Sequence, residues 1–82
     1  MSATRRRVRL TFPPRLIREP IVYRLVKDFD IVVNIRRAEV KADQGWIALE
    51  LDGEAERLER GIAWLEAQGV HVDALEGDVV FP

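Results

Sequence analysis

The order in which two hydrophobic periodicities follow one another constrains this chain more than any other feature. Apolar and polar side chains alternate over residues 7–12 and 46–52, which is the repeat of a strand with one buried face. Apolar residues instead recur every three or four positions over 18–29, and again between Gly53 and Gly69. That repeat is typical of a helix with one buried face. A chain of 82 residues folds these segments as one domain.

A further strand follows the first helix, and its pattern is irregular. Val33 and Ile35 point to one face of this strand, whereas Ala38 and Val40 have the opposite parity. Either both faces of the strand are covered, or a β-bulge near residues 36–37 shifts its register. Residues 42–45 are turn material and lead into the next strand.

The complete order is strand, helix, strand, strand, helix, strand, with the last strand at 70–73. This order predicts an α+β fold of ferredoxin-like βαββαβ type, a four-stranded antiparallel sheet in the order 4-1-3-2 with two helices on one face. Residues 79–81 either add a short edge strand or pack against the domain. We expect one domain over 1–82, with an ordered core at about 6–76 between a short basic arm and a C-terminal tail.

The predicted core contains the apolar residues of the buried faces. These are Val8, Leu10, Ile21, Leu25, Phe29, Ile35, Ile47, Leu49, Leu51, Leu58, Ile62, Leu65, Val70 and Val72. One layer of helices leaves the other face of the sheet and the edge of the second strand open. Because an exposed edge invites pairing with another chain, we expect a homodimer through this strand and the open face.

Composition excludes several classes of function. The chain has no cysteine, so it forms no disulfide and no thiolate metal site. It has no apolar run of the ~18 residues expected of a membrane span, and no continuous apolar stretch follows Arg5, Arg6 and Arg7 as a secretory signal requires. The cytoplasm is therefore the expected location. The net charge of −1 gives no general attraction to nucleic acid, and an RNA-binding sheet ranks a distant third among the possible functions.

Catalysis and metal binding have little support in the sequence. The glutamates of the second helix are interleaved with arginines, which is typical of a solvated helix face. The only serine is Ser2, so no serine triad exists. His71 and Asp73 share one strand face, but two side chains are too few for a metal site. We expect no enzyme, no catalytic residue, no metal and no cofactor.

Several segments, taken in order, resemble the NIL domain family. The similar segments are 19–22, Phe29, 33–35, Ala38, 49–53, 62–65 and 69–72. The family takes its name from Asn-Ile-Leu, and the motif here reads Asn34-Ile35-Arg36. The resemblance covers roughly residues 7–76 of the chain.

The resemblance implies an ACT-like fold and a regulatory role. NIL domains occur at the C-terminus of methionine-importer ATPases and beside ferredoxin modules. In the importers the resemblance implies a homodimer that binds methionine at its interface, with the asparagine of the motif at the ligand site. This sequence has no Gly-rich phosphate loop, so we expect a freestanding module that acts on a partner enzyme or transporter.

Five residues form the predicted ligand site: Asn34, Ile35, Arg36, Ala38 and Trp46. The Asn34 amide suits the carboxylate and ammonium groups of an amino acid, and asparagine is otherwise disfavoured in strands. Arg36 stands where the family has leucine. It either binds a carboxylate, which favours a more acidic ligand than methionine, or protects the edge strand against aggregation. Trp46 has the parity of the open face, where it stacks on a ligand or packs across a dimer.

Two functions follow from these observations. The first is a regulatory domain that binds an amino acid, methionine by resemblance, in sulfur amino-acid metabolism. The alternative is an interaction module without its own ligand. Such a module docks on a larger enzyme, for example a ferredoxin-dependent complex for sulfur transfer and homocysteine formation. Binding of amino acids by the purified chain distinguishes the two.

Overall fold

The computed structural model describes residues 3–75 and contains the predicted elements in the predicted order. The elements are β1 (Ala3–Phe12), the 3-10 turn η1 (Pro14–Leu16), α1 (Ile21–Phe29), β2 (Val32–Val40), β3 (Gly45–Glu54), α2 (Ala55–Gln68) and β4 (His71–Ala74). The first strand begins at Ala3 rather than at the predicted residue 7, so Arg5 and Arg6 also lie within it. The segment 79–81 lies outside the described residues.

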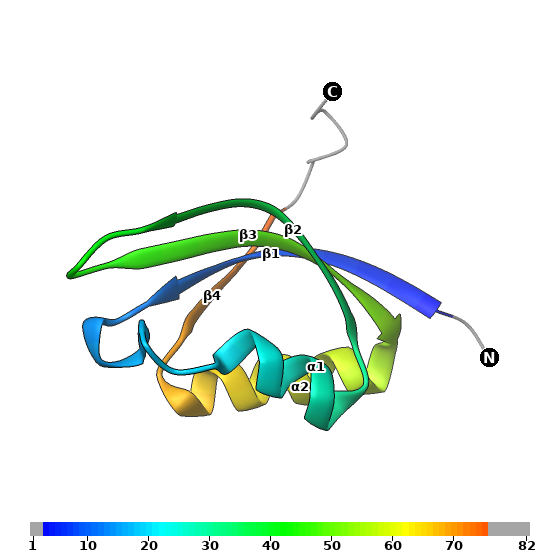
Figure 1. Ribbon diagram of the computed structural model, residues 1–82. Coiled ribbons are helices and arrows are strands. Elements are labelled where there is room, and N and C mark those ends of the chain that lie inside the picture. The colour runs from blue at the N-terminus through cyan, green and yellow to red at the C-terminus, as the bar shows by residue number, and fades with distance from the viewer. Residues whose placement is uncertain (1–2, 76–82) are drawn as a thin grey trace.

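The four strands form one antiparallel sheet in the order β2-β3-β1-β4. This is the predicted order read from the opposite edge, so the α+β topology is confirmed. Both helices lie against one face of the sheet, and the other face carries no helix of the described chain (Figure 1). The second strand is an edge strand, as predicted.

A β-bulge in β2 explains its irregular pattern. Ile35 pairs with Leu49 and Arg37 pairs with Ala48, which leaves Arg36 as an extra residue between two consecutive partners on β3. After the bulge Ala38 pairs with Ile47. Directly opposed residues share a face of the sheet, so Ile35 and Ala38 both lie on the helix side despite their opposite parity. Of the two readings of this strand, the bulge is the correct one.

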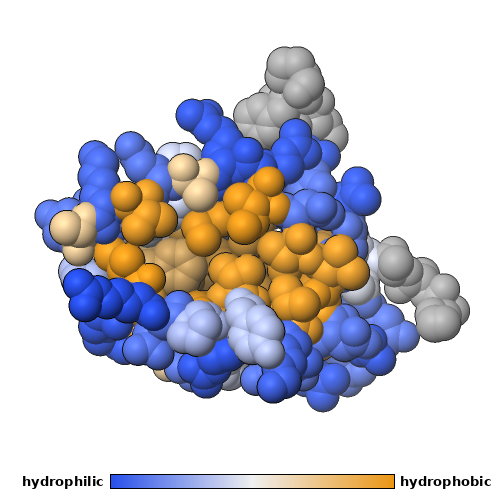
Figure 2. Space-filling model, viewed as in Figure 1, coloured by the Kyte–Doolittle hydropathy of each residue, from blue (hydrophilic) through white to orange (hydrophobic). Residues whose placement is uncertain are grey.

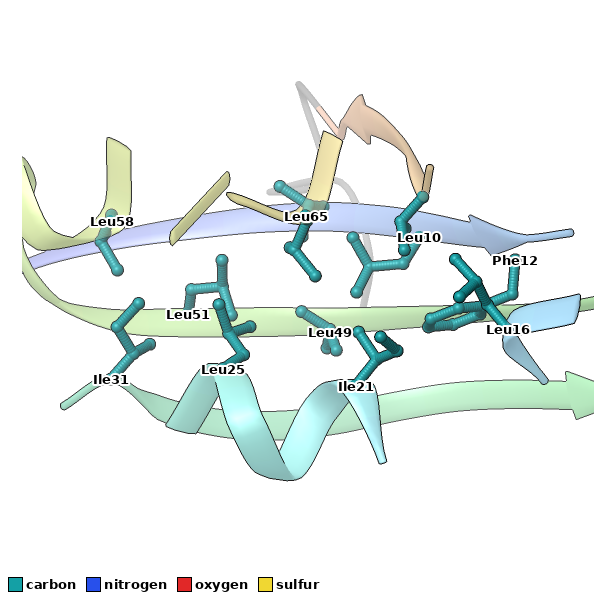
Figure 3. Close-up of a cluster of buried hydrophobic side chains, with 12 residues drawn as sticks. Leu10, Phe12, Leu16, Ile21, Leu25, Ile31, Leu49, Leu51, Leu58 and Leu65 are labelled. Carbon is teal, nitrogen blue, oxygen red and sulfur yellow. The ribbon is translucent and has the colours of Figure 1, made fainter. Parts of the chain in front are cut away.

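The core fills the space between the sheet and the two helices (Figure 3). Its buried residues are Val8, Leu10, Phe12, Leu16, Ile21, Leu25, Ile31, Leu49, Leu51, Leu58, Leu65 and Val70. Phe29, Ile47, Ile62 and Val72 are partly buried against this cluster, in accordance with the prediction. The prediction for Ile35 is wrong, because this side chain is 57% exposed. Ile35 faces the helix side, but it lies on an edge strand that the helices do not cover.

Two backbone positions fix the ends of the helices. Gly69 ends α2 with a φ of 106°, and the N–H of Val70 donates to the carbonyl of Leu65 at 3.0 Å. Glycine adopts this left-handed conformation without steric cost, as predicted for a helix cap. Asp30 ends α1 in the same region, with a φ of 56°. This sharp turn directs the chain into β2.

Exposed and half-buried apolar side chains gather on the side of the molecule formed by β2 and α1. We call this surface the apolar flank, and it consists of Ile35, Ala38 and Val40 on β2 with Val22, Tyr23 and Val26 on α1. Figure 2 shows apolar surface spread across this side of the molecule. Tyr23 and Val40 are each 62% exposed, and both border a groove of about 180 Å³.

Candidate functional site

The open face of the sheet is rich in charged side chains. Alternation along β1 directs Val8 and Leu10 into the core, and therefore directs Arg7 and Arg9 to the open face. Opposite them on β3, Glu50 pairs with Arg7 and Ala48 pairs with Arg9. Arginine occupies most of the outward positions of β1, so this strand gives the open face a charged surface.

Glu50 is the buried anion of this face. It is 6% exposed, although it points away from the core. Its Oε2 atom accepts a hydrogen bond from Arg36 Nη1 at 2.9 Å and lies 2.8 Å from Arg7 Nε. A buried carboxylate needs such partners, since an unpaired charge would be costly away from water. Glu50 therefore ties the edge strand β2 to the central strand β1 and fixes the two guanidinium groups.

Trp46 lies on the same face, as predicted from its parity. Its Nε1 donates a hydrogen bond to Glu39 Oε1 at 3.2 Å, and the guanidinium carbon of Arg9 lies 4.5 Å from the ring centroid. The second contact is a cation–π interaction, which holds both side chains against the sheet.

These side chains surround a hollow of about 410 Å³ on the open face. We call it the arginine hollow, and its lining residues are Arg7, Arg9, Arg36, Arg37, Trp46, Ala48, Leu49 and Leu75. Four of the eight described residues that line it are arginines, although the net charge of the whole chain is −1. The fold therefore concentrates positive charge that the composition does not reveal.

The β-bulge brings the two arginines of β2 into the hollow. Consecutive residues of a regular strand point to opposite faces, but Arg36 and Arg37 both line the arginine hollow. Arg36 is held there by Glu50, while Arg37 has no hydrogen bond or ion pair with another residue of the described part, 3–75.

The structure brings together only some of the five predicted ligand-site residues. Arg36 and Trp46 line the arginine hollow, and Asn34 lies next to it on the same face, opposite Glu50. Ile35 and Ala38 lie on the helix side of β2, where they belong to the apolar flank. The sheet separates the two groups, so one ligand on one copy of the chain cannot contact the side chains of all five.

The ligand site predicted from the sequence does not include the other charged residues of this face. Arg7 and Arg9 line the arginine hollow as Arg36 does, and Glu50 contacts both Arg7 and Arg36. A signal for them exists, since Arg5, Arg7 and Arg9 share the parity opposite to the core residues of β1. Arg5 also donates to Asp52 Oδ1 at 2.8 Å, and this hydrogen bond, with the attraction of the two charges, raises the pKa of Arg5.

His71 and Asp73 lie where their parity places them. His71 Nε2 is 3.1 Å from Asp73 Oδ1 on the exposed surface of β4. Within residues 3–75, no group of three or more His, Cys, Asp or Glu side chains is arranged to hold a metal ion. No helix in the same part of the chain is long and apolar enough to cross a membrane.

The topology and the open face together define a small α+β domain of the split βαβ class with an uncovered, charged sheet surface. A family model, the NIL domain, matches residues 6–74. The chain belongs to the NIL domain family. This confirms the resemblance noted in the sequence. No curated protein matches the chain.

Solved structures support the same fold. The C-terminal domain of an ABC transporter ATP-binding protein from Enterococcus faecalis superposes with a TM-score of 0.76 at 22% identity, covering 88% of this chain and 84% of that one. The C-terminal domain of the MgtC protein from Mycobacterium tuberculosis gives a TM-score of 0.55 at 24% identity, covering 89% and 88%. The de novo designed protein Foldit4 gives 0.59 at 8% identity, covering 90% and 94%. At these sequence identities, the similarity to the three structures shows a shared fold alone.

Proposed function

We propose that this chain is a non-catalytic regulatory domain of the cytoplasm that binds an amino acid on the open face of its sheet. The observation that carries the proposal is the position of Asn34. This residue lies on the exposed edge strand, two residues from Arg36 and beside the arginine hollow. Membership of the NIL domain family and the similarity to a domain of a transporter ATP-binding protein support a regulatory role.

The chemistry around Asn34 suits a zwitterion. The side-chain amide offers two donors and an acceptor, and the guanidinium of Arg36 can hold a carboxylate through two parallel hydrogen bonds. The outer edge of β2 pairs with no other described strand, so its free backbone N–H and C=O groups can bind the same ligand. Trp46 and Ala48 provide apolar surface for a ligand side chain. The family resemblance implies methionine as the first ligand to test.

Replacing Asn34 by alanine is expected to weaken amino-acid binding roughly tenfold or more. The reason is the loss of at least one hydrogen bond to a charged group, worth about 1.5–3 kcal/mol. Isothermal titration of the chain with each of the twenty amino acids measures this loss. Gln44→Ala is the matched control, because Gln44 is an exposed amide in the β2–β3 turn and should leave affinity unchanged. Equal affinities of the Asn34→Ala variant and the unchanged protein would contradict the proposal.

We also propose that the chain forms a homodimer through the apolar flank and the neighbouring edge of β2. Ile35 and Val40 are 57% and 62% exposed, and they adjoin a strand edge with free backbone groups. Exposed apolar side chains of this size beside an open edge are typical of an interface. The charged open face is less suited to self-association, since it would bring arginines of two copies together.

Light scattering at tens of micromolar is expected to give about twice the monomer mass of 9.4 kDa. Val40→Lys places a charge within the apolar flank and should give the monomer mass. Val32→Lys is the control, because Val32 is 60% exposed on the same strand but lies on the open face, opposite Asp52. A monomeric mass for the unchanged chain would argue against self-association. A monomeric mass together with no binding of any amino acid would favour the alternative function, a docking module. In that case a partner protein would cover the apolar flank.

A further inference from the structure

We infer that the ligand of the open face is an acidic amino acid, whose second anionic group binds in the arginine hollow. This inference rests on the proposed function, which places an amino acid beside Asn34. It differs from the methionine that the family resemblance implies. The observation that carries it is an excess of guanidinium groups on one side of the sheet, where four arginines line a single hollow.

Among residues 3–75, Glu50 is the one carboxylate within this arginine cluster, and its single charge does not balance four guanidinium groups. Arg7 and Arg36 both contact the same oxygen atom of Glu50, so this carboxylate is shared between two guanidinium groups. The other carboxylates of the open face have partners elsewhere. Glu39 accepts from Trp46, Asp52 accepts from Arg5, and Asp73 contacts His71. Within the described part of the chain, positive charge is therefore left over where Arg9 and Arg37 line the hollow.

Arg37 is the arginine best placed to bind a ligand. No other residue of the described chain forms a hydrogen bond or ion pair with it, and the bulge turns it into the hollow beside Arg36. A guanidinium presents parallel N–H groups that match the two oxygens of a carboxylate or phosphate. The bulge gives this strand two adjacent anion-binding groups, where a regular strand would present one.

The size of the site fits a ligand with two acidic groups. Asn34 pairs with Glu50, and Arg37 pairs with Ala48 two positions away on β3. Residues two apart on a regular strand lie about 7 Å from each other, which is roughly the length of a small amino acid. The amino and carboxyl groups bind at Asn34, and the second anionic group enters the hollow of about 410 Å³. Trp46 and Ala48 also line the hollow and offer apolar surface to the connecting carbon atoms. A second carboxylate and a phosphate present the same chemistry to the arginines.

Isothermal titration of the full chain at low ionic strength tests the inference with four probes. L-glutamate and O-phospho-L-serine carry the two kinds of second anion, L-glutamine is the neutral isostere of glutamate, and L-methionine is the ligand implied by resemblance. We expect at least one acidic probe to bind tenfold or more tightly than both neutral probes. The stronger of the two acids identifies the second anionic group. Raising the salt concentration should weaken the acidic probes more than the neutral ones.

Two arginine variants localise the effect. Arg37→Gln should abolish the preference for the acidic probe and leave glutamine affinity unchanged. Arg60→Gln should preserve the preference, since Arg60 is exposed on α2, on the other side of the sheet. Unchanged melting temperatures of both variants confirm that they fold.

Three other results of the titration would contradict the inference, and one of them would also contradict the proposed function. If methionine or glutamine binds as tightly as both acids, the inference is overturned and the proposed function stands. If no probe binds, the proposed function and the inference both fail. Tighter binding of a short single-stranded RNA than of either acid also overturns the inference, because the hollow would then serve a phosphate backbone.

Discussion

Replacing Leu65 by alanine is expected to lower the free energy of unfolding by about 2–5 kcal/mol. Leu65 projects from α2 into the core and has no exposed surface. Alanine would remove buried methyl groups and leave a cavity between the helix and the sheet (Figure 3). A domain of this size has a thin core and a small total stability, so this one substitution can remove most of it.

Urea unfolding followed by far-UV circular dichroism measures the change. Arg60→Ala is the matched control, because it places the same residue on the exposed side of the same helix. This variant should stay within about 0.5 kcal/mol of the unchanged protein. A loss below about 1 kcal/mol for Leu65→Ala would mean that α2 does not pack on the sheet as described.

Replacing Glu50 by glutamine is expected to cost about 1.5–3 kcal/mol of folding free energy. The carboxylate binds Arg7 and Arg36 at 2.8 and 2.9 Å, and it is 6% exposed. Glutamine keeps the shape of the side chain but removes the negative charge that Arg7 and Arg36 share. Because Arg36 is half exposed, water screens part of the repulsion, and the loss should lie toward the lower end of this range.

The control for Glu50→Gln is Glu59→Gln. Glu59 lies 3.3 Å from Arg6, but its side chain is 66% exposed, so its loss should cost less than about 1 kcal/mol. Added salt should restore part of the stability of Glu50→Gln, since salt screens the repulsion among the arginines. Equal and small losses for the two variants would show that Glu50 does not organise the open face.

The fold could be predicted from periodicity because its core faces are regular. Val8 and Leu10 alternate with arginines, and Leu58 and Leu65 recur at helical spacing. Ile35 was misplaced because alternation reports which face of a sheet a residue occupies, and not whether a helix covers that part of the face. On an edge strand such as β2, a residue can lie on the helix side of the sheet and still remain in contact with water.

The candidate site could be predicted only in part, for a different reason. Asn34, Arg36 and Trp46 belong to the ligand site predicted from the sequence, and the structure places them on one face. Glu50 was missed because a polar residue in a strand normally contacts water, and its burial depends on arginines from two other strands. The positive hollow arises only when β1 and β2 lie on either side of β3. Such charge clustering depends on strand order, which residue composition does not contain.

Binding on the open face is tested most directly by a nuclear magnetic resonance titration of the isotope-labelled chain with L-glutamate and L-methionine. We predict that the signals of the Asn34 side-chain amide, the Arg36 backbone amide and the Trp46 indole N–H shift together and saturate. Signals from Leu16 and Val22, which border the groove beside α1 on the helix side, should stay unchanged in the same titration. Shifts confined to that groove, or no shift at millimolar amino acid, would contradict ligand binding on the open face.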